Sequence, residues 1–150
     1  MAMQDPESEH GVSGEGQDLL GAFFRRSPSP MWVYDAETLR FLHVNQAAIS
    51  RYGYSEEEFL SMTLLDIRPQ EFAVKVREAV DAVERGLLDD ADWLHLDRSG
   101  REMWVRIRSV PMPEIRPRAR MAWVQETSDL VQARRREQEM LQRFGVVSKA

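Results

Sequence analysis

The chain has 150 residues, a mass of 17.4 kDa, a formal net charge of -5 and a mean hydropathy of -0.49, which fit one soluble globular domain with polar extensions. It contains no cysteine, which excludes disulfides, cysteine-ligated metals and thiol nucleophiles. The acidic balance gives no general attraction to nucleic acid or anionic lipid, and no apolar run approaches the roughly 18 residues of a membrane-spanning helix, so we expect a cytoplasmic module that contacts neither.

The N-terminal segment divides into a polar part and an apolar part. Residues 1–17 are mostly Gly, Ser, Glu and Gln, so we expect a flexible tail there. From Asp18, apolar residues recur at helical spacing and predict a short amphipathic helix that ends at the SPSP stretch, residues 27–30. We interpret its apolar edge as a surface for a second copy of the chain. The candidate dimer contacts on this helix are Leu19, Leu20, Phe23 and Phe24.

A β-hairpin is predicted next. Residues 31–45 hold two short runs of β-forming residues separated by a four-residue loop. Regular alternation places Leu42 and Val44 on one face of the second strand, and Phe41 and His43 on the other. We therefore expect His43 at the protein surface.

Helix signals follow this hairpin. Asn45 is the only asparagine in the chain and stands where an N-cap would begin the helix QAAISRYG, which Gly53 ends. Ser55 and Glu58 form a capping-box pattern for the next helix. Residues 70–86 then carry apolar side chains at helical spacing and predict one longer amphipathic helix.

Three more β runs, at residues 90–97, 101–110 and 117–126, complete the pattern. The element order predicts an α+β domain, a five-stranded antiparallel sheet whose helices gather between the second and third strands and cover one face. Residues 127–144 predict a charged helix with too few apolar positions for a core helix, so we expect it to project outward.

The segment SPSPMWVYDAETLRFLHVNQAAISRYGYSEEEFLSMTLLDIRP resembles the front half of bacterial PAS sensory domains, with the hairpin, the V-N-x-A-A helix start and the Y-G-Y-S-x-E-E helix entry in order. The later segment LDRSGREMWVRI is similar to the hairpin and W-V strand of that family, with Ser99 in place of the usual acidic turn residue. The family's closing D-I-T signature appears as Glu126, Thr127 and Ser128, which keeps a carboxylate and a hydroxyl. The resemblance covers residues 18–137.

This resemblance implies a PAS fold with an N-terminal amphipathic helix, a C-terminal signalling helix and a noncatalytic sensory role. It implies a PAS domain over residues 18–128 and a linker helix over residues 129–150 that leads to a further domain. We expect a homodimer that passes conformational change to a C-terminal output such as a histidine kinase, with Glu126, Thr127 and Ser128 at the signal junction. The alternatives are an input domain of a cyclic-di-GMP enzyme and a ligand-free scaffold that binds protein alone.

The resemblance also bears on cofactors. Haem-binding members of the family place an iron-ligating His on the helix before the third strand, and residues 70–85 contain none. Flavin-binding light sensors of the family use several Asn and Gln amides and a reactive Cys, whereas this chain has one Asn and no Cys. We therefore predict no haem, no cysteinyl flavin and no metal, and at most a small apolar ligand of unidentified chemistry.

Such a ligand would occupy an apolar pocket between the sheet and its helices. The candidate pocket residues are Val33, Leu42, Val44, Phe59, Ile67, Phe72, Val76, Val80, Trp93, His95, Val105 and Ile107. Trp93 or His95 would be the polar contact, although we also interpret His95, like His43, as an ordinary surface histidine. The alternative is that these side chains only fill the core, which a domain of this size needs in order to fold.

Two arginine-rich regions complete the candidate surfaces. Trp104 falls beside Arg106 and Arg108 on one strand face, so we expect an exposed partner surface and name Trp104 a dimer candidate, with stacking of these arginines on its ring as the alternative. Residues 134–136 are arginines flanked by acidic residues, which indicates a solvated or coiled-coil helix face. A small cavity-containing isomerase is a further alternative, but the inward strand positions are apolar and no catalytic residue can be proposed.

Overall fold

The computed structural model describes residues 14–145, apart from the side chains of Ser128, Leu130 and Gln132. The strands are β1 (Met31–Asp35), β2 (Phe41–Val44), β3 (Trp93–Leu96), β4 (Glu102–Pro111) and β5 (Ala119–Glu126). The helices are α2 (Gly14–Arg26), α3 (Gln46–Tyr52), α4 (Glu56–Leu60), the short 3-10 helix η1 (Gln70–Phe72), α5 (Ala73–Glu84) and α6 (Ser128–Arg143). Within this part of the chain, no helix is long and apolar enough to cross a membrane.

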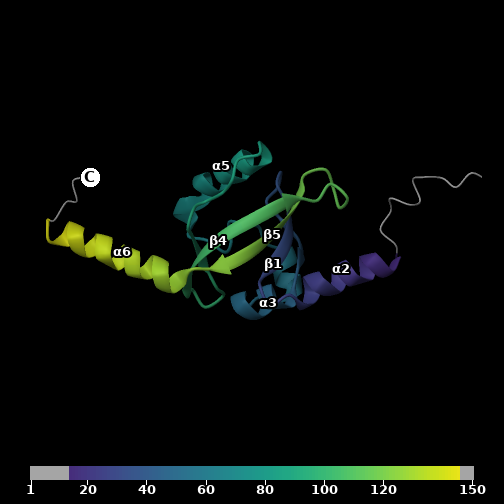
Figure 1. Ribbon diagram of the computed structural model, residues 1–150, viewed down its shortest axis with the longest axis horizontal. Coiled ribbons are helices and arrows are strands. Elements are labelled where there is room, and N and C mark those ends of the chain that lie inside the picture. The colour runs from purple at the N-terminus through teal and green to yellow at the C-terminus, as the bar shows by residue number, and fades with distance from the viewer. Residues whose placement is uncertain (1–13, 146–150) are drawn as a thin grey trace, which may run out of the picture.

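All five strands form one antiparallel sheet in the order β2-β1-β5-β4-β3. Helices α3, α4 and α5 bury their apolar residues against one face of this sheet, which we call the inner face. Helices α2 and α6 extend away from the sheet at opposite ends of the molecule (Figure 1). This architecture confirms the predicted α+β fold and the outward direction of the C-terminal helix.

The predicted helix caps are present. The Asn45 side chain accepts a hydrogen bond from the Ala48 amide at the start of α3, and Gly53 ends that helix in the left-handed conformation, with a φ of 81°. Ser55 and Glu58 form a complete capping box at α4, in which each side chain pairs with the other residue's backbone amide. Local sequence therefore sets where these two helices begin.

Helix α2 begins earlier than predicted. It starts at Gly14 rather than at Asp18, so residues 14–17 of the expected flexible tail are helical, while residues 1–13 lie outside the described part. Glu15 lies in the first turn, where a carboxylate is favourable at the positive end of the helix dipole. Because these four residues carry no apolar side chain, the hydrophobic pattern did not mark this first turn.

The predicted alternation along β2 is wrong because the β1–β2 pairing contains a bulge. Val33 pairs with His43, but the next residue, Tyr34, pairs with Phe41, so Leu42 has no partner in the register. Phe41 is therefore in the inner core and Leu42 is not. His43 is exposed, as predicted.

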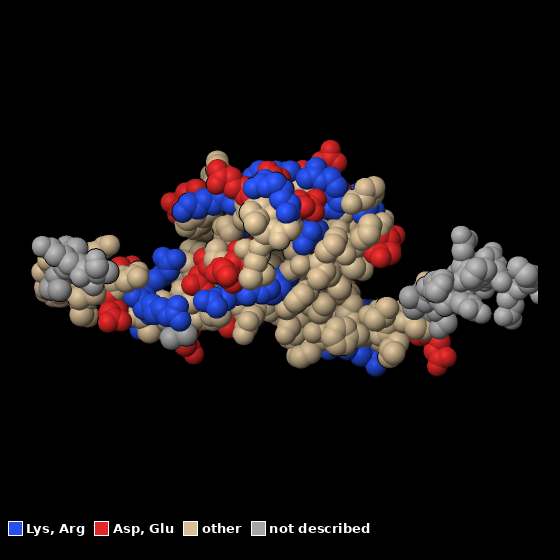
Figure 2. Space-filling view, turned by 45° about the horizontal axis from the view of Figure 1, so that its top comes forward, with Lys and Arg blue, Asp and Glu red and all other residues tan. Residues whose placement is uncertain are grey.

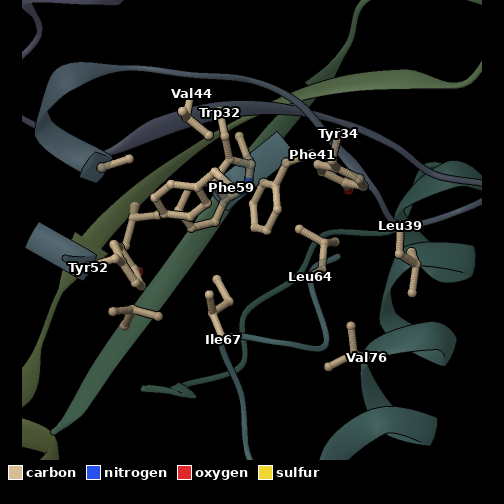
Figure 3. Packing of buried hydrophobic residues seen from close by; sticks show 14 of the residues in the cluster. Trp32, Tyr34, Leu39, Phe41, Val44, Tyr52, Phe59, Leu64, Ile67 and Val76 are labelled. Atoms are coloured by element: carbon tan, nitrogen blue, oxygen red, sulfur yellow. The ribbon is translucent and has the colours of Figure 1, made fainter. Parts of the chain in front are cut away.

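Aromatic rings form the centre of the inner core (Figure 3). Trp32 makes edge contacts with Phe41 and Tyr52, at ring-centroid distances of 5.3 and 5.7 Å, and Phe41 makes one with Phe59 at 5.1 Å. These edge-to-face pairs add specific geometry to the burial of large apolar surfaces. The opposite side of the sheet, which we call the outer face, carries the alternate residues of each strand, such as Val33 and its cross-strand partner Met121.

Candidate functional site

A cavity of about 90 Å³ lies between the inner face and α5. Most of its wall is apolar and comes from α5, the loop after it and the sheet: Trp32, Tyr34, Leu64, Val76, Ala79, Val80, Val83, Leu87, Leu88, Trp93, Ile107 and Ala122. The polar part of the wall consists of Arg68, Asp89, Arg108, Ser109 and Arg120. Since one water needs roughly 10–15 Å³ measured in this way, the cavity has room for several waters or one small organic molecule.

The structure brings only some of the predicted pocket residues together. Val76, Val80, Trp93 and Ile107 line the cavity. The others that point into the inner core but do not line the cavity are Val44, Phe59, Ile67, Val105 and His95. Phe72 and Leu42 are half-buried outside the cavity wall, and Val33 lies on the outer face, opposite Met121. The sequence pattern could not separate these groups, because apolar residues occur at all three kinds of position: in a packed core, in a cavity wall and on the opposite sheet face.

His95 is fully buried, so its interpretation as a surface histidine is wrong. It pairs with Met103 on the inner face, and its Nδ1 lies 2.6 Å from the Tyr52 hydroxyl oxygen. Burial lowers the pKa of His95 well below its ordinary value, and the nearby charge of Arg68 lowers it further, so the ring is neutral at pH 7. Sequence alternation missed this because β3 has only four residues and gives no independent sign of which face is covered.

Buried arginines are the feature of the cavity that the sequence did not reveal. Arg120 is buried and forms an ion pair with Glu84 at 3.1 Å, and Arg108 pairs with Asp90 at 3.2 Å. Arg68 is also buried, but no described acid forms an ion pair with it. The only sequence signal for Arg68 was its place after Ile67 in an apolar stretch, because arginine is ordinarily an exposed residue.

The dimer candidates on α2 are mostly unpartnered within the described chain. Leu19, Leu20 and Phe23 are 71%, 61% and 65% exposed, and no residue of α2 is fully buried. Phe24 is half-buried and helps to line an open apolar groove between α2 and the outer face, where Met31, Val33, Met121, Met112 and Ile115 also lie. Figure 2 shows mostly uncharged atoms where α2 meets the domain.

Trp104 is buried, not exposed as predicted. The guanidinium carbon of Arg135 in α6 lies 3.5 Å from the centroid of the Trp104 ring, which is a cation–π contact. The expected partners Arg106 and Arg108 instead pair with Asp92 and Asp90. The sequence could not show this contact because it joins a strand to a helix that was expected to project away from the domain.

The predicted signal junction lies where β5 ends and α6 begins. Glu126 forms a two-pronged salt bridge with Arg51 of α3, with N–O distances of 2.7 and 2.8 Å, and this bonding holds the pKa of Glu126 below its usual range. The Thr127 amide donates to the Trp104 carbonyl at 2.8 Å, and Ser128 is the first residue of α6. The junction is therefore tied to both α3 and β4.

Comparisons with known proteins agree with this geometry. The curated methyl sulfide methyltransferase-associated sensor of Methanosarcina acetivorans is 27% identical over 70 residues, which cover 47% of this chain and only 7% of that protein. A domain of a sensory box sensor histidine kinase/response regulator from Geobacter sulfurreducens superposes with a TM-score of 0.65 at 19% identity, over 77% of this chain and 99% of that one. A PAS domain from a two-component sensor histidine kinase gives a TM-score of 0.63 at 21% identity, over 82% and 100%.

These structural likenesses show the fold, and a family model adds the sequence relationship. The model described as PAS domain matches residues 28–122, which is more than half of the chain. The matched segment begins in the linker before β1 and ends within β5, so it contains every residue that lines the cavity described above. The chain belongs to the PAS domain family.

Proposed function

We propose that this chain is a noncatalytic sensory module that binds a small molecule in its cavity and passes the change through α6 to a C-terminal output such as a histidine kinase. The observation that carries the proposal is the continuity of the cavity, β5 and α6. Arg120 and Ala122 of β5 line the cavity, and the same strand runs to Glu126, two residues before α6 begins. A shift of β5 at the cavity therefore acts on the base of α6.

Contacts at the base of α6 give this helix a defined starting position. The Arg51–Glu126 salt bridge ties the end of β5 to α3, and the Thr127 amide ties the junction to β4. Arg135 then holds the first turns of α6 against Trp104. The Arg51–Glu126 pair is half-exposed, where a single salt bridge contributes little stability, so a change at the cavity can rearrange this contact at low cost.

We further propose that the module is a homodimer through α2. The helix presents Leu19, Leu20 and Phe23 to solvent beside an apolar groove on the outer face, and contiguous exposed apolar surface of this kind marks interaction sites. An isologous contact between two copies would bury both helices at once.

The relay is tested by placing a larger side chain of α5 in the cavity, in the absence of any ligand. Ala79 lines the cavity, whereas Ala82, three residues later on the same helix, does not. We expect Ala79→Leu to change hydrogen exchange of the α6 amides, measured by mass spectrometry, and Ala82→Leu to leave α6 unchanged. Unchanged α6 exchange in a folded Ala79→Leu protein would contradict the relay.

The dimer is tested by native mass spectrometry of the purified chain beside its denatured spectrum. We expect a dimer for the wild type, a monomer for Phe23→Ser, and a dimer for the control Val74→Ser, which removes an equally exposed apolar side chain from α5. A monomeric wild type, or a Phe23→Ser protein that stays dimeric, would rule out the α2 interface.

A further inference from the structure

Arg68 is a cation enclosed in the cavity wall that forms no ion pair within the described residues, although the charge of Asp89 acts on it from farther away. It is only 8% exposed. Its Nη1 donates to the Leu64 carbonyl at 2.5 Å, and its guanidinium carbon lies 5.7 Å from the Trp93 ring centroid. Its Nε is buried with no hydrogen-bond partner. A buried charge with an unsatisfied donor is costly, so this arrangement indicates a group that pairs with it.

The other charged groups at the cavity already have partners. Arg108 pairs with Asp90, and Arg120 pairs with Glu84 and with the Ser109 hydroxyl. Asp89 is the one acidic residue in the described wall, and its two carboxylate oxygens accept hydrogen bonds from the Ala91 amide and the Trp93 indole N–H. Arg68 is therefore the cation of this wall that is left for a ligand.

Arg68 remains charged at neutral pH. Burial lowers the pKa of its guanidinium to about 10, still well above 7. A planar guanidinium matches the two oxygens of a carboxylate.

The size and lining of the cavity define the rest of the ligand. At about 90 Å³ it is smaller than the roughly 300–1,000 Å³ of most ligand pockets, which excludes nucleotides, haem and flavins. The rest of the wall is largely apolar and includes Val76 and Val80 of α5 and Ile107 of β4. One anionic head and a short hydrocarbon tail fit this combination.

We infer that the cavity binds a short-chain monocarboxylate, with the carboxylate on Arg68 and the hydrocarbon against Val76, Val80 and Ile107. This inference rests on the proposed sensory function, since it names the ligand class of the same cavity.

Binding is tested by isothermal titration calorimetry with sodium propionate at constant ionic strength. Propionamide is the matched probe, because it has nearly the same shape and no charge. We expect saturable 1:1 binding of propionate and at least tenfold weaker binding of propionamide. Equal binding of the two probes, no binding of propionate, or binding of inorganic phosphate in preference to propionate would overturn the inference.

Variants assign the binding to Arg68. Arg68→Met is expected to weaken propionate binding at least tenfold, and the control Arg106→Gln, which alters an arginine paired with Asp92 outside the cavity wall, is expected to bind normally. Undiminished binding by Arg68→Met would contradict the assignment. Should Arg68→Met not fold, the wild-type protein still provides a test, since propionate must shift the NMR resonance of the Arg68 Nε–H, and an unmoved resonance at saturation overturns the site.

The experiments distinguish a failure of the carboxylate-ligand proposal from a failure of the relay proposal. Propionate binding without any change in α6 hydrogen exchange supports the carboxylate site and contradicts the proposed relay. Conversely, an α6 response to Ala79→Leu together with no propionate binding supports the relay and overturns the ligand class.

Discussion

The two faces of the sheet are covered to different extents. The inner face is covered by α3, α4 and α5 of the same chain, and its central rings, such as Trp32 and Phe59, are almost fully buried (Figure 3). The outer face is covered only in part, by α2 at one end and α6 at the other, and α2 leaves Leu19 and Phe23 exposed. The inner face thus carries the stability of the fold and the cavity, while the outer face carries contacts that can change.

The largest expected effect comes from a comparison of two tryptophans on neighbouring strands. Trp32 is in the inner core, and Trp123 of β5 lies on the outer face and is 37% exposed. We expect Trp32→Ala to lower the free energy of unfolding by about 3–5 kcal/mol, because it removes the centre of the aromatic cluster, and Trp123→Ala by less than about 1 kcal/mol. Guanidinium unfolding followed by circular dichroism measures both. Similar losses for the two variants would remove the distinction between the faces.

A second test concerns Asn45, which connects the chain before β1 to the inner core. Its side-chain oxygen accepts hydrogen bonds from the Met31 and Ala48 amides at 3.0 Å, and its amide group donates to the Ser29 carbonyl. We expect Asn45→Ala to cost about 2 kcal/mol of stability, because a buried backbone donor loses its partner. The control Ser55→Ala, at an exposed cap, should cost about 1 kcal/mol. Equal losses of stability in the two variants would show that the Asn45 hydrogen bonds to Met31 and Ser29 contribute nothing beyond the cap of α3.

A third test uses the histidine on each face and depends on pH. Buried His95 stays neutral in the folded protein because its pKa is depressed, whereas in the unfolded chain it gains a proton below about pH 6.5. The unfolded state then binds more protons, so the free energy of unfolding falls as pH falls from about 6.5 to 5, by at most about 1.4 kcal/mol per pH unit. Urea unfolding across this range should show the slope in the wild type and in His43→Gln, and lose it in His95→Gln. A slope retained in His95→Gln would assign the effect to other groups.

The smallest expected effect on stability is at the junction between the faces. Arg51→Gln breaks a half-exposed salt bridge with Glu126, so we expect a loss of only about 0.2–1 kcal/mol. We also expect faster hydrogen exchange in the first turns of α6. Arg98→Gln, which breaks the exposed pair with Glu58 far along the chain from α6, serves as the control and should leave α6 exchange unchanged. Identical α6 exchange in both variants would show that the Glu126 contact does not position the helix.

Several parts of the fold could be predicted from the sequence because local chemistry controls them. The caps at Asn45 and Ser55 depend on side chains that bond amides within three residues, and the structure contains both. The strand runs and the outward C-terminal helix follow from hydrophobic spacing alone. The alternation along β2 failed because a bulge at Leu42 is set by the pairing with β1, which spacing within one strand does not report.

By itself, the sequence determined the helix caps, the number of strands, the α+β class and the family of this protein, since each is encoded in neighbouring residues. Only the tertiary structure decided that His95 and Arg68 are buried and that Trp104 lies under Arg135. The physical reason is that burial depends on what packs above a residue, and the covering groups come from segments distant in sequence: Tyr52 bonds His95 across 43 positions. The charge of Arg68, which forms no ion pair within the described residues, is likewise buried by the packing of several segments and not by its own segment alone.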